Sequence, residues 1–253
     1  PEYFKPLVEH KHLAEPKSKD QLDVEIQAAL APVRAESRQL VPLLDALRRF
    51  QRWQLLRIGA CDLLNLLDLP AVTRQLSDLA DSLVRACLAI ASARSHTAAQ
   101  GFAVIALGKL GGRELNYSSD VDLLFLAASD ATAYRRLGER LIEALTRVTA
   151  EGFLYRVDMR LRPWGQVGAL VSSLDGYLSY LAHHARPWER QALLKARVIA
   201  GDEAVGEAFL RQAGPLLFDS AIEVARADVH AMKQRTEADL RRRGRDWGEV
   251  KLG

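Results

Sequence analysis

The first hundred residues carry leucine and alanine at three- and four-residue spacing, with polar and charged residues between them. This periodicity predicts amphipathic helices over residues 21–30, 40–67 and 72–96, each with one apolar face for the core. We expect Pro32 and Pro42 to separate the first two helices, because proline lacks the amide that a helix interior requires. The amino-terminal third of the chain is therefore predicted to be helical.

The pattern changes at Gly101. Residues 102–107 and 121–126 are short and strongly apolar, which is typical of buried strands, and glycines follow the first of them. Residues 133–149 return to helical spacing, and residues 153–161 alternate with a period of two, as a half-exposed strand does. The expected order is therefore strand, glycine loop, strand, helix, strand.

Helical periodicity returns after residue 174 and continues almost to the end, with a long helix predicted over about 219–243. The predicted fold class is α+β, with a small mixed sheet flanked by helical regions. Four segments follow from these patterns: a loose amino-terminal segment over 1–20, a helical region over 21–98, a sheet core over 99–172 and a helical region over 173–253.

The composition is that of an ordinary folded chain. Apolar residues make up 49% of the 253 positions and charged residues 26%, which excludes disordered and fibrous classes. No apolar run approaches the ~20 residues that cross a bilayer, and the amino terminus lacks a signal-peptide layout, so we expect a cytoplasmic protein. Cys61 and Cys87 have no partner at metal-ligand spacing and are predicted to be reduced core residues.

The net charge names no partner. It is only +3, because 35 Lys and Arg face 32 Asp and Glu across the chain. The run Arg241–Arg245 is basic, but at a helix end it is better explained as a solvated terminus that compensates the helix dipole. A nucleic-acid binder, whose mark would be salt-sensitive binding, is therefore the least favoured class.

Two carboxylates stand at the beginning of the second apolar run. Asp120 and Asp122 are two residues apart, so in a strand their side chains would project from the same face. Such a pair is repulsive unless a divalent cation such as Mg²⁺ bridges it or basic side chains neutralise it. Asp158, in the alternating run, could reach the same ion from an adjacent strand. Three carboxylates behind a glycine-rich turn fit a two-metal phosphoryl or nucleotidyl transfer site.

The glycine-rich turn precedes these acids. Gly108, Gly111 and Gly112 form either a simple turn or a backbone that approaches a phosphate, and we assign Gly111 and Gly112 to phosphate binding. Lys109 is either solvated or neutralises that phosphate. The remaining candidate donors are the hydroxyls of Ser118 and Ser119.

Two arginines follow the third acid. Arg160 and Arg162 are two residues apart, on what is predicted to be one strand face. Beside three carboxylates they are interpreted as phosphate clamps or as structural partners of the acids, with solvated surface arginines as the simpler alternative. A later helix is predicted over the segment that follows Pro187. Its polar residues should face the site or the solvent: Glu189, Lys195 and Arg197. Its apolar residues should face the core: Trp188, Leu193 and Leu194.

Three motifs together resemble the bacterial bifunctional glutamine synthetase adenylyltransferase/adenylyl-removing enzyme family. They are GKLGGRELNYSSDVDLLF over residues 108–125, YRVDMRLRPWG over 155–165 and WERQALLKARVIAGD over 188–202. They stand in the family's order and approximate spacing, and the resemblance covers most of the chain from about Leu40. That number of matched motifs makes a chance resemblance untenable.

The resemblance implies a DNA polymerase beta-like nucleotidyltransferase module over residues 99–172. In such a module Asp120 and Asp122 are the metal-binding pair, Asp158 is the third carboxylate, and Mg²⁺ is the cofactor. Full-length members are several times longer and contain two homologous catalytic halves. The chain therefore resembles one half of such a protein.

The resemblance is closer to the amino-terminal, deadenylylating half, in which an aromatic residue such as Trp164 follows the proline. The implied function is Mg²⁺-dependent removal of AMP from an adenylylated glutamine synthetase tyrosine by phosphorolysis, which yields ADP. The alternatives are the adenylylating half, which transfers AMP from ATP and shares the motifs NYSSD and ARVIAGD, and a non-catalytic module that binds a nucleotide or a regulator. The implied partners are glutamine synthetase, ATP or ADP, phosphate and a PII-type signal protein, with no membrane and no nucleic acid.

Overall fold

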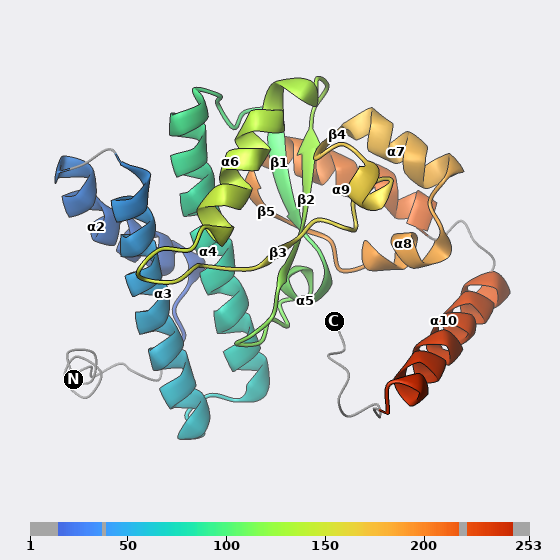
Figure 1. Ribbon diagram of the computed structural model, residues 1–253, viewed down its shortest axis with the longest axis horizontal. Coiled ribbons are helices and arrows are strands. Elements are labelled where there is room, and N and C mark those ends of the chain that lie inside the picture. The colour runs from blue at the N-terminus through green and yellow to red at the C-terminus, as the bar shows by residue number, and fades with distance from the viewer. Residues whose placement is uncertain (1–14, 37–38, 218–221, 245–253) are drawn as a thin grey trace.

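The computed structural model describes residues 15–36, 39–217 and 222–244 (Figure 1). Three helices come first: α2 (Lys19–Glu36), α3 (Leu40–Leu63) and α4 (Leu69–Ser95). They confirm the helical prediction for the amino-terminal third. Of the expected loose segment 1–20, residues 1–14 lie outside the described residues, and α2 already begins at Lys19.

The prolines do not separate these helices as predicted. Pro32 lies inside α2, near its end, and Pro42 lies in the first turn of α3, where its missing amide would have had no intrahelical partner. Pro70 likewise lies in the first turn of α4. Asp68 caps that helix by accepting a hydrogen bond from the Ala71 amide at 2.8 Å.

In the described part of the chain, five strands form one mixed sheet. They are β1 (Phe102–Ala106), β2 (Val121–Ala127), β3 (Val157–Asp158), β4 (Val171–Ser173) and β5 (Arg197–Gly201). The order is β3-β2-β1-β5, and β4 also pairs with β2. β1 runs antiparallel to β2 and β5, whereas β3 and β4 run parallel to β2. The predicted α+β class, a small mixed sheet between helical regions, is confirmed.

The two faces of the sheet pack against different helices (Figure 1). Alternate β1 residues, beginning with Phe102, join a core shared with α2, α3, α4 and α6 (Arg135–Thr146). The others, beginning with Ala103, join a second core with α7 (Leu174–His183) and α9 (Glu203–Leu217). Because both faces are covered, all five β1 residues are buried, and the sequence shows a continuous apolar run there. The amino-terminal helices and the sheet therefore share one core.

The remaining elements are α5 (Gly108–Gly111), η1 (Thr132–Tyr134), η2 (Gly165–Val167), α8 (Pro187–Ala192) and α10 (Ile222–Arg242). α10 confirms the long helix predicted near the carboxyl end, and Figure 1 shows it standing apart from the sheet. The basic run Arg241–Arg245 begins in its last turn, and residue 245 lies outside the described residues.

Two predictions about the later segments are wrong. Residues 153–161 do not form a continuous alternating strand: only β3 pairs, because the chain turns after Met159. Residues 197–201 were expected in a helix but form β5, because they pair with β1. The short strand β4 was not predicted.

Two further expectations concern the core and the membrane. Cys61 and Cys87 are both buried, which confirms their predicted place in the core. Over the described ranges, none of the helices combines the length and the apolar character that crossing a bilayer requires.

Candidate active site

Two of the predicted acids face each other across neighbouring strands. In the parallel pair formed by β2 and β3, Asp122 lies directly opposite Asp158. Asp120 immediately precedes β2, which begins at Val121, the first residue of the predicted apolar run, so Asp122 lies within the strand and Asp120 at its edge. The side chain of Asp120 is 47% exposed, whereas that of Asp158 is 16% exposed.

Asp122 and Asp158 line a cavity of about 500 Å³. The other lining residues come from the turn after β1, from the segment after β3 and from α8: Gly108, Arg160, Leu161, Trp188 and Ala192. Sites for small molecules in proteins are concave and usually measure about 300 to 1,000 Å³. This cavity is therefore the candidate active site.

The charges around Asp122 are unfavourable to its ionised form. Burial, followed by the neighbouring carboxylates of Asp158 and Asp120, raises the pKa of Asp122 to about 6. The cations of Arg160 and Lys109 act in the opposite direction but do not prevail. A carboxylate in this position gains most when a further cation enters the cavity.

Arginines hold the two flanking acids. The Arg160 Nε donates hydrogen bonds to both carboxylate oxygens of Asp158, at 3.0 and 2.8 Å, and these bonds lower the pKa of Asp158. The Arg156 Nε donates to Asp120 Oδ1 at 2.5 Å and its Nη2 donates to the carbonyl of Ser118 at 3.0 Å. Arg156 was not identified as a site residue from the sequence. Its position at the start of the motif RVDMR, two residues before Asp158, was the signal that could have identified it.

The glycine turn adjoins the acids through its first member. Gly108 has a φ of +55°, and a Cβ there would lie 2.4 Å from Asp122 Oδ2, so both the backbone conformation and the space require glycine. The Leu107 amide donates to the carbonyl of Asp122 at 2.9 Å. The turn and the β2 carboxylate are therefore held in direct contact.

Gly111 and Gly112 lie elsewhere in the turn. A Cβ on Gly111 would lie 2.2 Å from the carbonyl oxygen of Lys195, and one on Gly112 would lie 2.8 Å from Lys195 Cδ. Neither residue lines the cavity of Asp122 and Asp158. These two positions require glycine because the segment that precedes β5 approaches the turn so closely that a side chain would collide with Lys195.

A buried ion pair fixes the turn to the rest of the molecule. Arg197 in β5 donates to Asp81 Oδ2 at 2.5 Å and to Asp81 Oδ1 at 3.1 Å, and Asp81 is fully buried in α4. The same guanidinium donates to the carbonyls of Leu110 at 2.9 Å and Gly111 at 3.3 Å. Arg197, expected on a helix, is thus a strand residue that ties the glycine turn to α4.

The remaining phosphate-binding candidates occupy different places. Lys109 is close enough to Asp122 to lower its pKa. Ser118 and Ser119 line a second cavity of about 360 Å³, together with the aromatic residues Tyr117 and Phe153. The Ser119 hydroxyl donates to Asn116 Oδ1 at 2.7 Å. The structure therefore brings Lys109, but not the two serines, to the acids that line the first cavity.

The two expected arginine clamps also separate. Arg160 lines the cavity and its side chain is 70% exposed. Arg162 donates from all three guanidinium nitrogens to backbone carbonyls, those of Gly168, Met159 and Gln166. Arg162 therefore closes the turn after β3, and only Arg160 is placed to contact a ligand beside the acids.

Trp188 is the site residue that sequence reasoning placed wrongly. It was expected in the core but is 43% exposed and lines the cavity. Leu194, also expected in the core, is 54% exposed, whereas Leu193 is buried as predicted. The expected long helix ends at Ala192, so its period does not extend to Leu193 and Leu194, whereas Trp188 lies within α8, in its first turn.

The oxygen ligands in the cavity are of the type that Mg²⁺ prefers. Asp122 and Asp158 both line the cavity. Asp120 does not line it, but its negative charge is near enough to raise the pKa of Asp122. Across the described ranges, no three His, Cys, Asp or Glu side chains are gathered closely enough to hold a metal together. Binding through all three acids would require Asp120 and Asp158 to leave their arginines.

The raised pKa of Asp122 predicts a pH dependence of stability. Its folded-state pKa of about 6 exceeds the unfolded value of about 3.9, so the folded state binds the proton more tightly and stability falls as the pH rises from 4 to 6. In EDTA, we expect Asp122→Asn to increase the free energy of unfolding by about 1 to 3 kcal/mol at pH 8 and to leave it unchanged at pH 3.5. Urea unfolding at both pH values measures this, and an equal effect at the two would contradict the origin given for the shift.

Comparison with known proteins places these motifs in a family. The family model described as glutamate-ammonia ligase adenylyltransferase matches residues 1–212. The chain is 37% identical over 253 residues to a protein of Hahella chejuensis named bifunctional glutamine synthetase adenylyltransferase/adenylyl-removing enzyme, covering 91% of this chain and 26% of that protein. A protein of the same name from Pseudomonas aeruginosa is 36% identical over 271 residues, which cover 98% of this chain and 27% of that protein. Another, from Chromobacterium violaceum, is 40% identical over 200 residues, which cover 76% of this chain and 22% of that protein. The chain spans about a quarter of the length of these curated relatives.

Proposed function

The chain belongs to the glutamate-ammonia ligase adenylyltransferase family, and from this membership we propose that its cavity removes AMP from an adenylylated tyrosine of glutamine synthetase by phosphorolysis. The observation that carries the proposal is the pairing of Asp122 with Asp158 in a cavity that Gly108 also lines. Trp164, the aromatic residue after Pro163, supports the adenylyl-removing direction by the resemblance given above.

In the proposed reaction an oxygen of inorganic phosphate attacks the phosphorus of the adenylyl group. The new phosphorus–oxygen bond yields ADP, the bond to the tyrosine oxygen breaks, and that oxygen takes up a proton. Mg²⁺ held by Asp122 and Asp158, with Asp120, would supply charge neutralisation at the phosphoryl oxygens. The chain's part in such chemistry is to position the groups and to stabilise charge.

Arg160 is the residue placed to hold the attacking phosphate. Its guanidinium lines the cavity, and its side chain is largely exposed, so it is able to exchange Asp158 for an anion. A cation held by the carboxylates of Asp122 and Asp158 would compete with Arg160 for Asp158 and so leave the guanidinium free to bind an anion. Lys109 adds a second positive charge on the side of the glycine turn. Gly108 keeps that wall of the cavity free of a side chain.

The direction of transfer is tested by two parallel incubations of the chain with Mg²⁺. One contains adenylylated glutamine synthetase and phosphate, and the other contains unmodified glutamine synthetase and ATP, with AMP on the tyrosine followed by mass spectrometry. We expect loss of AMP and formation of ADP in the first incubation and no change in the second. Gain of AMP in the second would contradict the removing direction and assign the chain to adenylylation.

No transfer in either incubation would contradict the catalytic proposal. A nucleotide-binding or regulator-binding module would then remain, and equilibrium dialysis with labelled ADP would identify it. The same incubations with EDTA in place of Mg²⁺ test the cofactor, because the proposed reaction requires the divalent ion. Transfer at an unchanged rate in EDTA would exclude the assigned role of the three carboxylates.

A further inference from the structure

The residues that line the candidate active site are of two chemical kinds. Asp122, Asp158 and Arg160 are charged, whereas Leu161, Trp188 and Ala192 are mainly apolar. The charged residues suit a phosphate and its counterions. The apolar residues suit a flat, weakly polar group joined to that phosphate.

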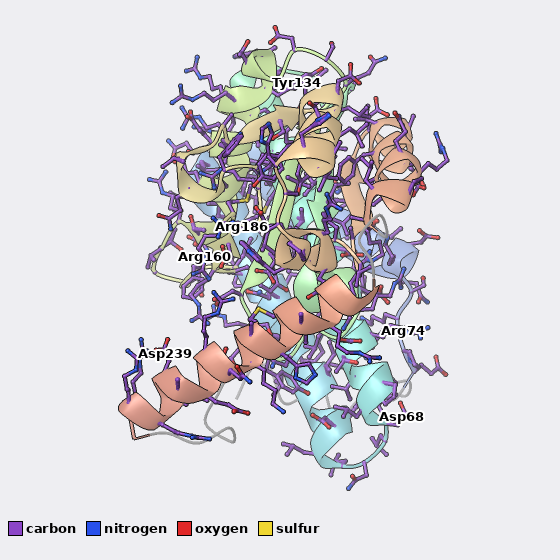
Figure 2. The ribbon with its side chains drawn as sticks, turned by 90° about the vertical axis from the view of Figure 1, so that its right-hand side faces the viewer. Asp68, Arg74, Tyr134, Arg160, Arg186 and Asp239 are labelled. Carbon is purple, nitrogen blue, oxygen red and sulfur yellow. The ribbon has the colours of Figure 1, made fainter. Side chains whose placement is uncertain are left out.

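Trp188, one of the apolar lining residues, lies in an anchored turn. Its neighbour Glu189 accepts a hydrogen bond from the Tyr180 hydroxyl at 2.6 Å and another from the Arg186 amide at 2.8 Å. These bonds hold the first turn of α8, which includes Trp188, in place. The turn lies on the side of the molecule where Figure 2 labels Arg160 and Arg186. The indole is therefore carried on an anchored backbone rather than on a loop.

Trp188 and Trp164 are both partly exposed but differ in what surrounds their rings. Trp164 is 57% exposed, but its ring packs edge-on against Tyr180, with the ring centroids 5.0 Å apart, and lies 5.1 Å from the His184 ring. Trp188 is 43% exposed and lines the cavity that contains the acids. An indole has a large apolar face, and its exposure to water is unfavourable. A flat ring that stacks on this face removes it from water, which is favourable.

We propose that Trp188 is the wall on which the purine base of the nucleotide stacks. This inference rests on the proposed function, because it takes the ligand of the charged residues to be an adenylyl group. The adenine ring is assigned to Trp188 in preference to the phenol ring of the modified tyrosine, because the bicyclic purine covers more of the indole face than a single ring does.

The test measures binding and does not depend on turnover. Equilibrium dialysis with labelled AMP and with labelled ribose 5-phosphate is carried out on the wild-type chain and on Trp188→Ala, Trp188→Phe and the matched control Trp164→Phe. We expect Trp188→Ala to raise the Kd for AMP about tenfold and to leave the Kd for ribose 5-phosphate unchanged, because the sugar phosphate has no base to stack. Trp188→Phe, which keeps an aromatic face, should raise the Kd for AMP less, and Trp164→Phe should not change it.

Two results would overturn the assignment. One is an unchanged Kd for AMP in Trp188→Ala, and the other is an equal loss of AMP and ribose 5-phosphate binding, which would mean that the substitution deforms the cavity. A higher KM for adenylylated glutamine synthetase with unaltered AMP binding would likewise overturn it, in favour of the phenol ring. Failure of the proposed function is separable: AMP binding that depends on Trp188 without transfer in either direction rejects catalysis and keeps the base-stacking wall.

Discussion

Asp122→Asn is expected to lower the rate of AMP transfer about a thousandfold while leaving the fold intact. Asp122 lines the cavity together with Asp158 and lies opposite it in register. Its Oδ2 lies 2.4 Å from the place that a Cβ on Gly108 would occupy. Asparagine has nearly the same shape but no charge, so it fills the space without attracting a divalent cation. The rate of AMP loss from adenylylated glutamine synthetase, measured at saturating phosphate, reports the effect.

The matched control is Asp175→Asn. Asp175 is an exposed carboxylate in the first turn of α7 and does not line the cavity, so its removal should leave the rate unchanged. Circular dichroism and thermal unfolding verify that both variants are folded. A folded Asp122→Asn protein with more than about a tenth of the wild-type rate would contradict the role of this carboxylate.

Arg197→Ala is expected to cost about 3 to 5 kcal/mol of unfolding free energy, the largest stability effect that we expect at a single position. The substitution leaves the carboxylate of Asp81 fully buried, and its remaining ion-pair partner among the described residues is the more distant Lys19 Nζ, at 3.6 Å. It also removes the donors to the carbonyls of Leu110 and Gly111, so the glycine turn loses its tie to α4. Urea unfolding at pH 7 measures the loss.

The double variant Asp81→Asn, Arg197→Ala separates the buried charge from the missing donors. It should recover part of the stability lost in Arg197→Ala, because the unpaired carboxylate is gone, while the carbonyls of the turn still lack their donor. Arg135→Ala is the surface control, since its pair with Glu139 is exposed at both ends and such pairs contribute less than about 1 kcal/mol. Equal losses for Arg197→Ala and Arg135→Ala would contradict the anchoring role.

The fold was predictable wherever one local pattern determined the element. β1 and β2 are buried on both faces and therefore appear as continuous apolar runs, and the long amphipathic helices α3 and α4 follow the 3.6-residue period. β3 and β4 have two and three residues, too few for a period to be distinctive. β5 has five residues, as β1 has, but it begins with Arg197 and ends with Gly201, so it is not a continuous apolar run. The identity of β3, β4 and β5 depends on pairing with β1 and β2, which is a long-range property that local spacing does not contain.

The candidate site divides in a similar way. The acids were predictable because carboxylates at the start of an apolar run are unusual, and the register of β2 and β3 does bring Asp122 opposite Asp158. The residues that face a ligand in the cavity were less predictable than the acids. Trp188 could not be recognised because its exposure depends on how α8 packs in the fold, which helical spacing does not contain. Arg162 could not be separated from Arg160 because its partners are the backbone carbonyls of a turn.

The proposed cation site at Asp122 and Asp158 is tested most directly by Mn²⁺ binding, followed by electron paramagnetic resonance in the wild-type, Asp122→Asn and Asp175→Asn proteins. We expect Mn²⁺ to bind the wild-type and Asp175→Asn proteins equally, to be displaced by Mg²⁺, and to bind Asp122→Asn at least about tenfold more weakly. Mn²⁺ binding of equal strength in all three proteins, or none in the wild-type protein, would contradict the assignment of these carboxylates as the metal ligands.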